Sequence, residues 1–137
     1  MKNKHILLVE DNPDDVELML RALKMARIDH EVSVARDGVE ALDYLFEKGT
    51  LPRVIFLDIN MPKISGLEVL KRLRADERTR RIPVVLFTSS KEDTDIRQGY
   101  GLGVNSYIHK PVDSVQFTDT VKQLAQYWLG LNETLPA

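Results

Sequence analysis

Four short apolar runs in this chain each end on polar residues that can bind a metal ion or a phosphoryl group. These ends are Glu10-Asp11, Asp58, Thr88 and Lys110. In a parallel α/β sheet the carboxyl ends of the strands meet at one edge, so residues far apart in the sequence can form one site there. Each residue alone has an ordinary structural explanation, such as a helix cap or a solvated lysine. Their placement after four different runs instead predicts one shared site.

The acidic residues of this set are suited to a hard divalent cation. Mg²⁺ binds carboxylate, water and phosphate oxygens, and Glu10, Asp11 and Asp58 can supply the carboxylates. Clustered carboxylates repel one another, so we expect a cation to relieve the repulsion. Asp58 follows a central run and can attack phosphorus as a nucleophile, which gives an aspartyl phosphate. Lys110 would then pair with the added charge, and the Thr88 hydroxyl would donate a hydrogen bond to a phosphoryl oxygen.

The elements that must hold these residues alternate along the chain. Apolar runs at 6–9, 54–57 and 84–87 are continuous, as in strands covered on both faces, whereas residues 31–35 alternate as an edge strand does. A shorter fifth strand is expected at 106–109. Amphipathic stretches separate these runs, which is typical of successive βα units. The pattern predicts an α/β fold with a parallel sheet.

The first helix has the clearest start signals. Asn12 can cap it, Pro13 suits its first position, and Asp14 and Asp15 complement the positive end of the helix dipole. Further helices are expected over residues 37–47, from the capping residue Ser65, over about 92–102, and from about Asp113.

Length and composition restrict the class of protein. A chain of 137 residues suits one domain, so we expect a single domain over residues 1–137. A net charge of -2 gives no reason to expect nucleic-acid binding, and the lack of cysteine excludes disulfides and thiolate metal sites. Residues 1–5 lead into too few apolar residues for a signal peptide or a membrane span, so a cytoplasmic protein is expected.

Four stretches of the chain resemble the receiver domain of two-component response regulators. They are Ile6–Asp11, Val54–Pro62, Val84–Ser89 and Asn105–Pro111. The resemblance covers essentially the entire chain. It implies a flavodoxin-like, doubly wound sheet of five strands in the order 2-1-3-4-5.

The resemblance also assigns a role to each acidic residue. It makes Asp58 the phosphoacceptor and Asp11 a direct ligand of Mg²⁺. Glu10, where the family often has aspartate, becomes a ligand through water. Asn60 becomes a ligand through its backbone carbonyl, and its side chain is expected to influence how water reaches the phosphoryl group.

The same resemblance implies a conformational switch. Thr88 and Lys110 become the pair that senses the phosphoryl group. Tyr107 becomes an aromatic switch that turns inward when Thr88 moves toward that group. The Lys110-Pro111 bond is implied to be cis, which is physically reasonable for an X-Pro bond in a tight turn.

Three further stretches are similar to the small response regulators that partner cyanobacterial and bacterial phytochromes. They are Asn12–Leu18, Ala41–Leu45 and His109–Asp113. The implied partner is a sensor histidine kinase, with a phytochrome as the candidate. About one helix remains after Lys110, so we expect a stand-alone receiver without an output domain. Such a receiver either changes what it binds or passes its phosphoryl group to a histidine phosphotransfer protein, and the sequence leaves both open.

A contact surface is also expected near the end of the chain. We expect a homodimer through the fourth helix, fifth strand and fifth helix, as family members commonly form. An equally good explanation is that these side chains only complete the core. The residues concerned are Tyr100, Leu102, Tyr127, Leu129 and Leu131.

Two other functions share parts of the pattern. A metal-dependent phosphatase that forms an aspartyl phosphate needs a second acid two residues after its nucleophile, where this chain has Asn60. A flavodoxin-like FMN carrier needs a phosphate-binding loop after the first strand, where Glu10 and Asp11 would repel a phosphate. The residues therefore favour a signalling protein that is not an enzyme.

Overall fold

The computed structural model describes residues 5–27, 30–47, 51–89, 93–111 and 113–133. Three parts of the chain named above lie outside the described residues. They are residues 1–4, Glu92 at the expected start of the fourth helix, and Val112 in the stretch His109–Asp113. The strands are β1 (His5–Val9), β2 (Glu31–Ala35), β3 (Val54–Asp58), β4 (Val84–Thr88) and β5 (Ser106–His109). The helices are α1 (Pro13–Met25), α2 (Gly38–Glu47), α3 (Gly66–Ala75), α4 (Asp93–Gly101) and α5 (Ser114–Ala125), which continues as the π-helical segment η1 (Gln126–Leu131).

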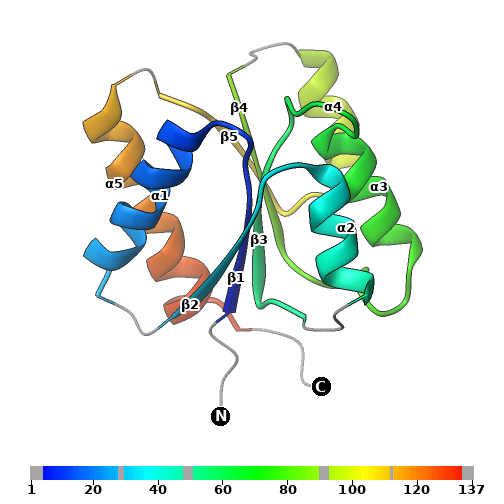
Figure 1. The fold of residues 1–137 in the computed structure, drawn as a ribbon, viewed down its shortest axis with the longest axis horizontal. Helices are drawn as coiled ribbons and strands as arrows, with labels where there is room; N and C mark the ends of the chain where they lie inside the picture. The colour runs from blue at the N-terminus through cyan, green and yellow to red at the C-terminus, as the bar shows by residue number, and fades with distance from the viewer. Residues whose placement is uncertain (1–4, 28–29, 48–50, 90–92, 112, 134–137) are drawn as a thin grey trace.

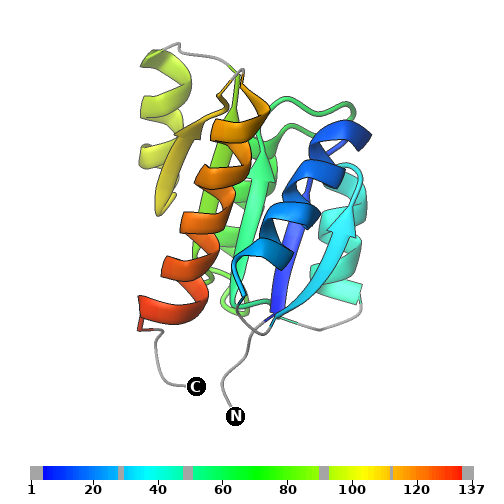
Figure 2. The ribbon, with the colours of Figure 1, turned by 90° about the vertical axis from the view of Figure 1, so that its left-hand side faces the viewer.

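The strands form one parallel sheet in the order β2-β1-β3-β4-β5. Helices α1 and α5 cover one face, and α2, α3 and α4 cover the other (Figure 1). Figure 2 shows α1 and α5 side by side in front of the sheet. The predicted α/β fold, with a doubly wound sheet in the order 2-1-3-4-5, is confirmed.

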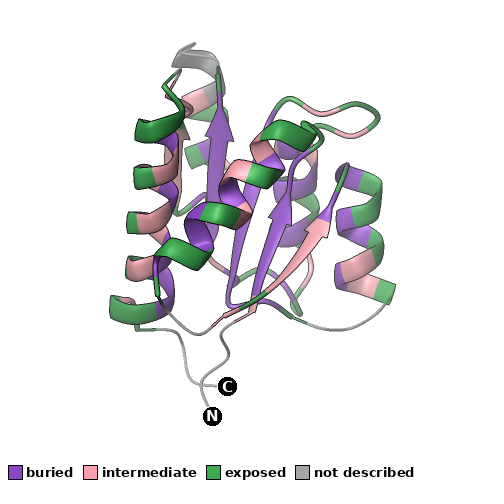
Figure 3. Ribbon diagram, turned by 60° about the vertical axis from the view of Figure 1, so that its left-hand side comes forward, coloured by how far each residue is buried: buried purple, intermediate pink, exposed green. Residues whose placement is uncertain are grey.

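The sheet separates two apolar layers, one beneath α1 and α5 and one beneath α2, α3 and α4. Strands β3 and β4 are buried along their whole length, which explains their continuous apolar sequence (Figure 3). Phe87 joins the first layer, with its ring centroid 5.6 Å from that of Phe56 and 6.5 Å from that of Phe117. Strand β2 lies at an edge and is partly exposed, as its sequence predicts.

Side-chain caps fix where the helices begin. Asn12 accepts hydrogen bonds from the first turn of α1, Ser65 does so for α3, and Asp113 for α5. Asp37 precedes α2 and accepts from the Glu40 backbone N–H at 2.9 Å. Each such cap contributes about 1 kcal/mol to stability.

Gly66 allows the start of α3 to pack directly against the end of β3. A Cβ atom at this position would lie 2.2 Å from the backbone oxygen of Asp58, which is closer than any real contact. The Gly66 N–H also donates to the Ile59 carbonyl at 2.9 Å. Glycine is therefore required here, and it holds the segment that follows Asp58 against the sheet.

Two expectations for the end of the chain are wrong. No peptide bond among the described residues is cis, so Lys110-Pro111 is trans. The trans isomer is intrinsically favoured, and the Lys110 N–H continues the β4–β5 pairing by donating to the Thr88 carbonyl at 2.7 Å. Leu129, expected on a contact surface, is buried. A π-helical turn takes up one more residue than an α-helical turn, and in η1 the adjacent Trp128 and Leu129 both face the core.

Candidate functional site

The carboxyl edge of the sheet brings the predicted site residues together. Glu10 directly follows β1, Asp58 is the last residue of β3, Thr88 is the last residue of β4, and Lys110 directly follows β5. The register pairs Asp58 with Phe87 and Thr88 with His109, so adjacent strands end at nearly the same level. One compact site therefore draws on four strands.

Three carboxylates form the acidic part of this site. One oxygen each from Glu10, Asp11 and Asp58 lies within 4.8 Å of the other two. Glu10 and Asp58 are buried, whereas Asp11 is exposed. All three donors are carboxylate oxygens, which suit hard cations such as Mg²⁺, Mn²⁺ and Ca²⁺. The residues therefore fit a divalent cation, and Asp11 is the carboxylate of the three that is exposed to solvent.

Lys110 supplies positive charge to the same site. Its Nζ lies 2.6 Å from Glu10 Oε1 and 3.5 Å from Asp58 Oδ1. Burial alone would lower the pKa of the Lys110 ammonium, but hydrogen bonding to Glu10 and the charges of Asp58 and Glu10 outweigh burial and raise it. Lys110 is therefore a fixed cation at the acidic edge.

The same environment makes Asp58 costly to ionise. Burial, followed by the charge of Glu10, raises the pKa of the Asp58 carboxyl well above its usual range, although Lys110 opposes this effect. A cation bound beside Asp58 would favour the carboxylate, which is the form that acts as a nucleophile. Ionisation of Asp58 and binding of a cation beside it would therefore be coupled.

Asn60 and Thr88 are connected by a contact that the sequence did not reveal. The Asn60 side-chain amide donates to Thr88 Oγ1 at 3.2 Å, and the Asn60 backbone N–H donates to Asp58 Oδ1 at 3.4 Å. Thr88 is fully buried. Asn60 therefore links the end of β3 to the hydroxyl at the end of β4.

Tyr107 lies on β5 and is far in the sequence from the three carboxylates of the site. It is half-buried and packs against the apolar layer beneath α2, α3 and α4. A Cβ on Gly99 of α4 would lie 3.5 Å from the Tyr107 ring and 3.0 Å from Leu86. The missing side chain at Gly99 thus lets α4 pack closely against Leu86, next to Tyr107.

Asp15 is a site residue that sequence reasoning missed. The sequence indicated only a charge that complements the dipole of α1, yet Asp15 Oδ2 lies 3.0 Å from Lys110 Nζ. No local pattern reveals a contact between residues 95 positions apart. The only available signal is that the first turn of α1 lies at the same sheet edge as Lys110.

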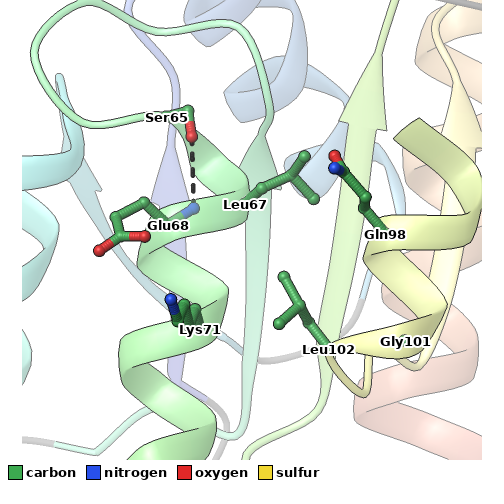
Figure 4. Close-up of a pocket in the computed structure, with 7 residues that line it drawn as sticks. All are labelled: Ser65, Leu67, Glu68, Lys71, Gln98, Gly101 and Leu102. Carbon is green, nitrogen blue, oxygen red and sulfur yellow. Dashed lines mark hydrogen bonds between the residues drawn. The ribbon is translucent and has the colours of Figure 1, made fainter. Parts of the chain in front are cut away.

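A separate hollow of about 470 Å³ lies between α3 and α4 (Figure 4). Leu67 and Leu102 extend into it from opposite sides, and Glu68 and Lys71 lie along α3. Its lining shares no residue with the acidic edge. The hollow is therefore distinct from the site described above.

The expected contact surface is only partly exposed. Tyr100 is 53% exposed, Tyr127 47% and Leu131 77%. Leu102 is half-buried, and Leu129 belongs to the core. A surface made of α4, β5 and α5 thus keeps three of its five predicted side chains. Separately, none of the helices in the described ranges is long and apolar enough to span a membrane.

The chain matches a family model and several named relatives. Residues 6–122 match the response regulator receiver domain. The chain is 43% identical over 133 residues to the probable methanogenesis regulatory protein FilR2 of Methanothrix harundinacea, which covers 94% of this chain and 86% of that protein. It is 38% identical over 139 residues to the response regulator Rcp1 of Synechocystis sp., which covers 98% of this chain and 94% of Rcp1.

This match corrects the prediction that the protein is not an enzyme. Receiver domains are phosphoryl-accepting signalling domains, so chemistry at the site is part of what the matched family does. The prediction treated signalling and chemical activity as exclusive. Asn60 argues against a phosphatase that needs a second acid at this position, but it does not argue against chemistry in a signalling domain. The classification as a non-enzyme is therefore wrong.

Solved structures give the same result. The manganese-bound form of Rcp1 superimposes with a TM-score of 0.91 at 36% identity, over 97% of this chain and 99% of that chain. The phosphorylated cyanobacterial phytochrome response regulator RcpA superimposes with a TM-score of 0.93 at 38% identity, over 98% of this chain and 100% of that chain. Sequence and fold agree over nearly the whole length, and the chain belongs to the response regulator receiver domain family of two-component signalling.

Proposed function

We propose that this protein is a receiver that accepts a phosphoryl group on Asp58 from a sensor histidine kinase. One observation carries the proposal: the buried Asp58 carboxylate ends the central strand beside the carboxylates of Glu10 and Asp11, and the Lys110 ammonium lies 3.5 Å from it. In the proposed transfer, Asp58 would be the nucleophile, and the Lys110 ammonium and the candidate metal ligands would lie near the phosphorus atom that it attacks. The proposed receiver is a single domain over residues 1–137.

The transfer exchanges one bond to phosphorus for another. An Asp58 carboxylate oxygen forms a bond to the phosphorus of a phosphohistidine, and the phosphorus–nitrogen bond breaks. The electron pair of that bond stays on the imidazole nitrogen of the kinase. Lys110 offsets the negative charge that the aspartyl phosphate adds, and the Thr88 hydroxyl donates to one of its oxygens.

We assign the cation as Mg²⁺. Asp11 and Asp58 would hold it directly, Glu10 through water, and Asn60 through its backbone carbonyl, and when bound it supplies positive charge toward the phosphodonor oxygens. The manganese-bound structure of Rcp1 and the all-oxygen donor set of this chain support a hard divalent ion.

A signal would leave the site through Thr88 and Tyr107. When Thr88 turns toward the phosphoryl group, it gives up the hydrogen bond it accepts from Asn60. Tyr107 then turns inward beneath α4. The surface of α4, β5 and α5 changes as a result, and the exposed Tyr100 and Tyr127 support its use in a homodimer.

The relatives indicate the kinase class. RcpA is a phytochrome response regulator, so we propose a phytochrome-type sensor kinase as the phosphodonor in the cytoplasm. The alternative output is transfer of the phosphoryl group to a histidine phosphotransfer protein.

Intact-mass analysis with Mg²⁺ and acetyl phosphate tests the proposal. We expect a single phosphoryl adduct on the wild type and none on Asp58→Asn. Asp43→Asn removes a carboxylate from the exposed side of α2 and serves as the matched control, with an adduct equal to that of the wild type. An adduct that persists in Asp58→Asn would contradict the assignment.

A further inference from the structure

Lys110 has a third carboxylate partner that lies outside the candidate metal cluster. Asp15, in the first turn of α1, lies 3.0 Å from Lys110 Nζ through its Oδ2. Glu10 lies at 2.6 Å and Asp58 at 3.5 Å. An ammonium group has three N–H donors, and three carboxylates surround this one. Lys110 therefore lies closer to Glu10 and Asp15 than to the phosphoacceptor.

Both ends of the Asp15–Lys110 contact are held by the fold. The Asp15 backbone N–H donates to the capping side chain of Asn12 at 3.3 Å, which fixes Asp15 in the helix start. The Lys110 backbone N–H donates to the Thr88 carbonyl at 2.7 Å. The Lys110 side chain is 13% exposed and that of Asp15 24%, so water screens the pair only in part. The ammonium can thus change partners only by moving its side chain.

Asp15 also differs from the other two carboxylates because it is not a candidate metal ligand. Glu10 and Asp58 contribute oxygens to the cluster that suits a cation, whereas Asp15 does not belong to it. A cation at that cluster would compete with the Lys110 ammonium for Glu10 and Asp58, and the Asp15 carboxylate would remain as a partner of Lys110.

We propose that Asp15 is a positioning residue that restrains Lys110 on the α1 side of the site until Asp58 is phosphorylated. This inference rests on the proposed function. Phosphorylation replaces a carboxyl group that carries at most one negative charge with a phosphoryl group that carries up to two, so the attraction on Lys110 toward position 58 increases. Lys110 then exchanges Asp15 for a phosphoryl oxygen. Asp15 thereby opposes the phosphorylated state and sets how readily the site enters it.

Binding of beryllofluoride, a noncovalent phosphoryl mimic, measures this competition. The bound fraction is followed by ¹⁹F NMR in Mg²⁺ at low ionic strength. We expect Asp15→Asn to bind about 5-fold more tightly than the wild type, the size of effect typical of a partly exposed ion pair. Asp15→Glu keeps the carboxylate and is expected to restore the wild-type affinity. Added salt should reduce the difference between Asp15→Asn and the wild type.

Asp14→Asn is the matched control. It removes the same charge from the same turn of α1, but the Asp14 side chain is exposed and makes no hydrogen bond or ion pair within the described part of the chain. We expect its affinity to stay within about twofold of the wild type. A general change in helix charge or helix stability would affect Asp14→Asn and Asp15→Asn alike.

The outcomes separate the inference from the proposed function. Suppose that the wild type binds beryllofluoride. If Asp15→Asn then binds it with the same affinity as Asp14→Asn, or more weakly than the wild type, the restraining role of Asp15 is overturned and the proposed function of Asp58 stands. Absence of both a beryllofluoride signal and an acetyl phosphate adduct in the wild type overturns the proposed function, and the inference falls with it. Tighter binding confined to Asp15→Asn supports both.

Discussion

Replacing Asp58 with asparagine is expected to stabilise the metal-free protein. Asparagine keeps the shape of the side chain but removes one charge from a cluster of three carboxylates. The variant removes the proposed nucleophile, so stability and phosphorylation should move in opposite directions. This combination distinguishes a functional carboxylate from a structural one, because a structural residue loses stability when it is replaced.

The expected gain follows from the burial of Asp58 and from the charges beside it. At an effective dielectric constant of about 20, Asp58 and Glu10 repel by about 3.5 kcal/mol at 4.8 Å, the upper limit of their separation. Lys110, at 3.5 Å, attracts Asp58 by about 4.7 kcal/mol under the same assumption, and the exposed Asp11 is screened by water. These pairwise energies nearly cancel, whereas burying the Asp58 charge costs several kcal/mol, so removing that charge should stabilise the protein by about 2 kcal/mol.

The gain should depend on pH in a defined direction. Burial and the charge of Glu10 raise the pKa of Asp58, so the folded state keeps a proton that the unfolded state has released. The wild type therefore loses stability as pH rises above the unfolded pKa of about 4 toward the raised folded value. Asp58→Asn lacks this dependence. Its advantage should be small at about pH 4 and larger at about pH 8.

Urea unfolding in a chelator at low ionic strength provides the assay. The unfolding midpoint of Asp58→Asn should lie above that of the wild type with an unchanged slope. Asp43→Asn, on the exposed face of α2, should stay within about 0.5 kcal/mol of the wild type. Saturating Mg²⁺ should stabilise the wild type and have little effect on Asp58→Asn. Equal or lower stability of Asp58→Asn in chelator would refute the electrostatic reasoning.

Three further predictions concern other parts of the molecule. Gly66→Ala should lower stability by about 1–3 kcal/mol in urea unfolding because its Cβ would overlap the backbone, whereas Gly101→Ala, with open space around it, should be neutral or stabilising. Asp37→Asn should cost stability at pH 7 but little at pH 3, because the hydrogen bond from the backbone N–H of the α2 first turn lowers the pKa of Asp37 and its contribution is lost as pH falls through that value; an equal loss at both pH values would contradict this. A double-mutant cycle of Asp15→Asn and Lys110→Met on stability should give a coupling of about 0.5–1 kcal/mol at low salt, and additive effects would exclude the pair.

The sequence was sufficient for the architecture because the signals for it are local. Continuous apolar runs identified the buried strands, and side chains such as Asn12 and Ser65 identified the starts of helices α1 and α3. The edge of a parallel sheet then gathers whatever follows its strands. The sequence alone therefore predicts that Glu10 and Asp58 lie in one cluster, as the structure shows.

The features that the sequence did not reveal depend on how the helices and side chains are arranged in three dimensions. The contact of Asp15 with Lys110 requires the angle of α1 to the sheet, which no spacing encodes. Burial of Leu129 depends on the π-helical turn that extends α5, and a regular helical period misplaces it. The cis bond before Pro111 came from resemblance alone, and the structure has the trans isomer.

Identification of the modified residue tests the central claim most directly. The protein is treated with acetyl phosphate and Mg²⁺, reduced with borohydride, which converts an aspartyl phosphate to homoserine, and mapped by peptide mass spectrometry. The account predicts homoserine at position 58 and nowhere else. Reduction at Asp11, or no reduced residue in a protein that carries a phosphoryl adduct, would contradict the assignment of Asp58 as the phosphoacceptor.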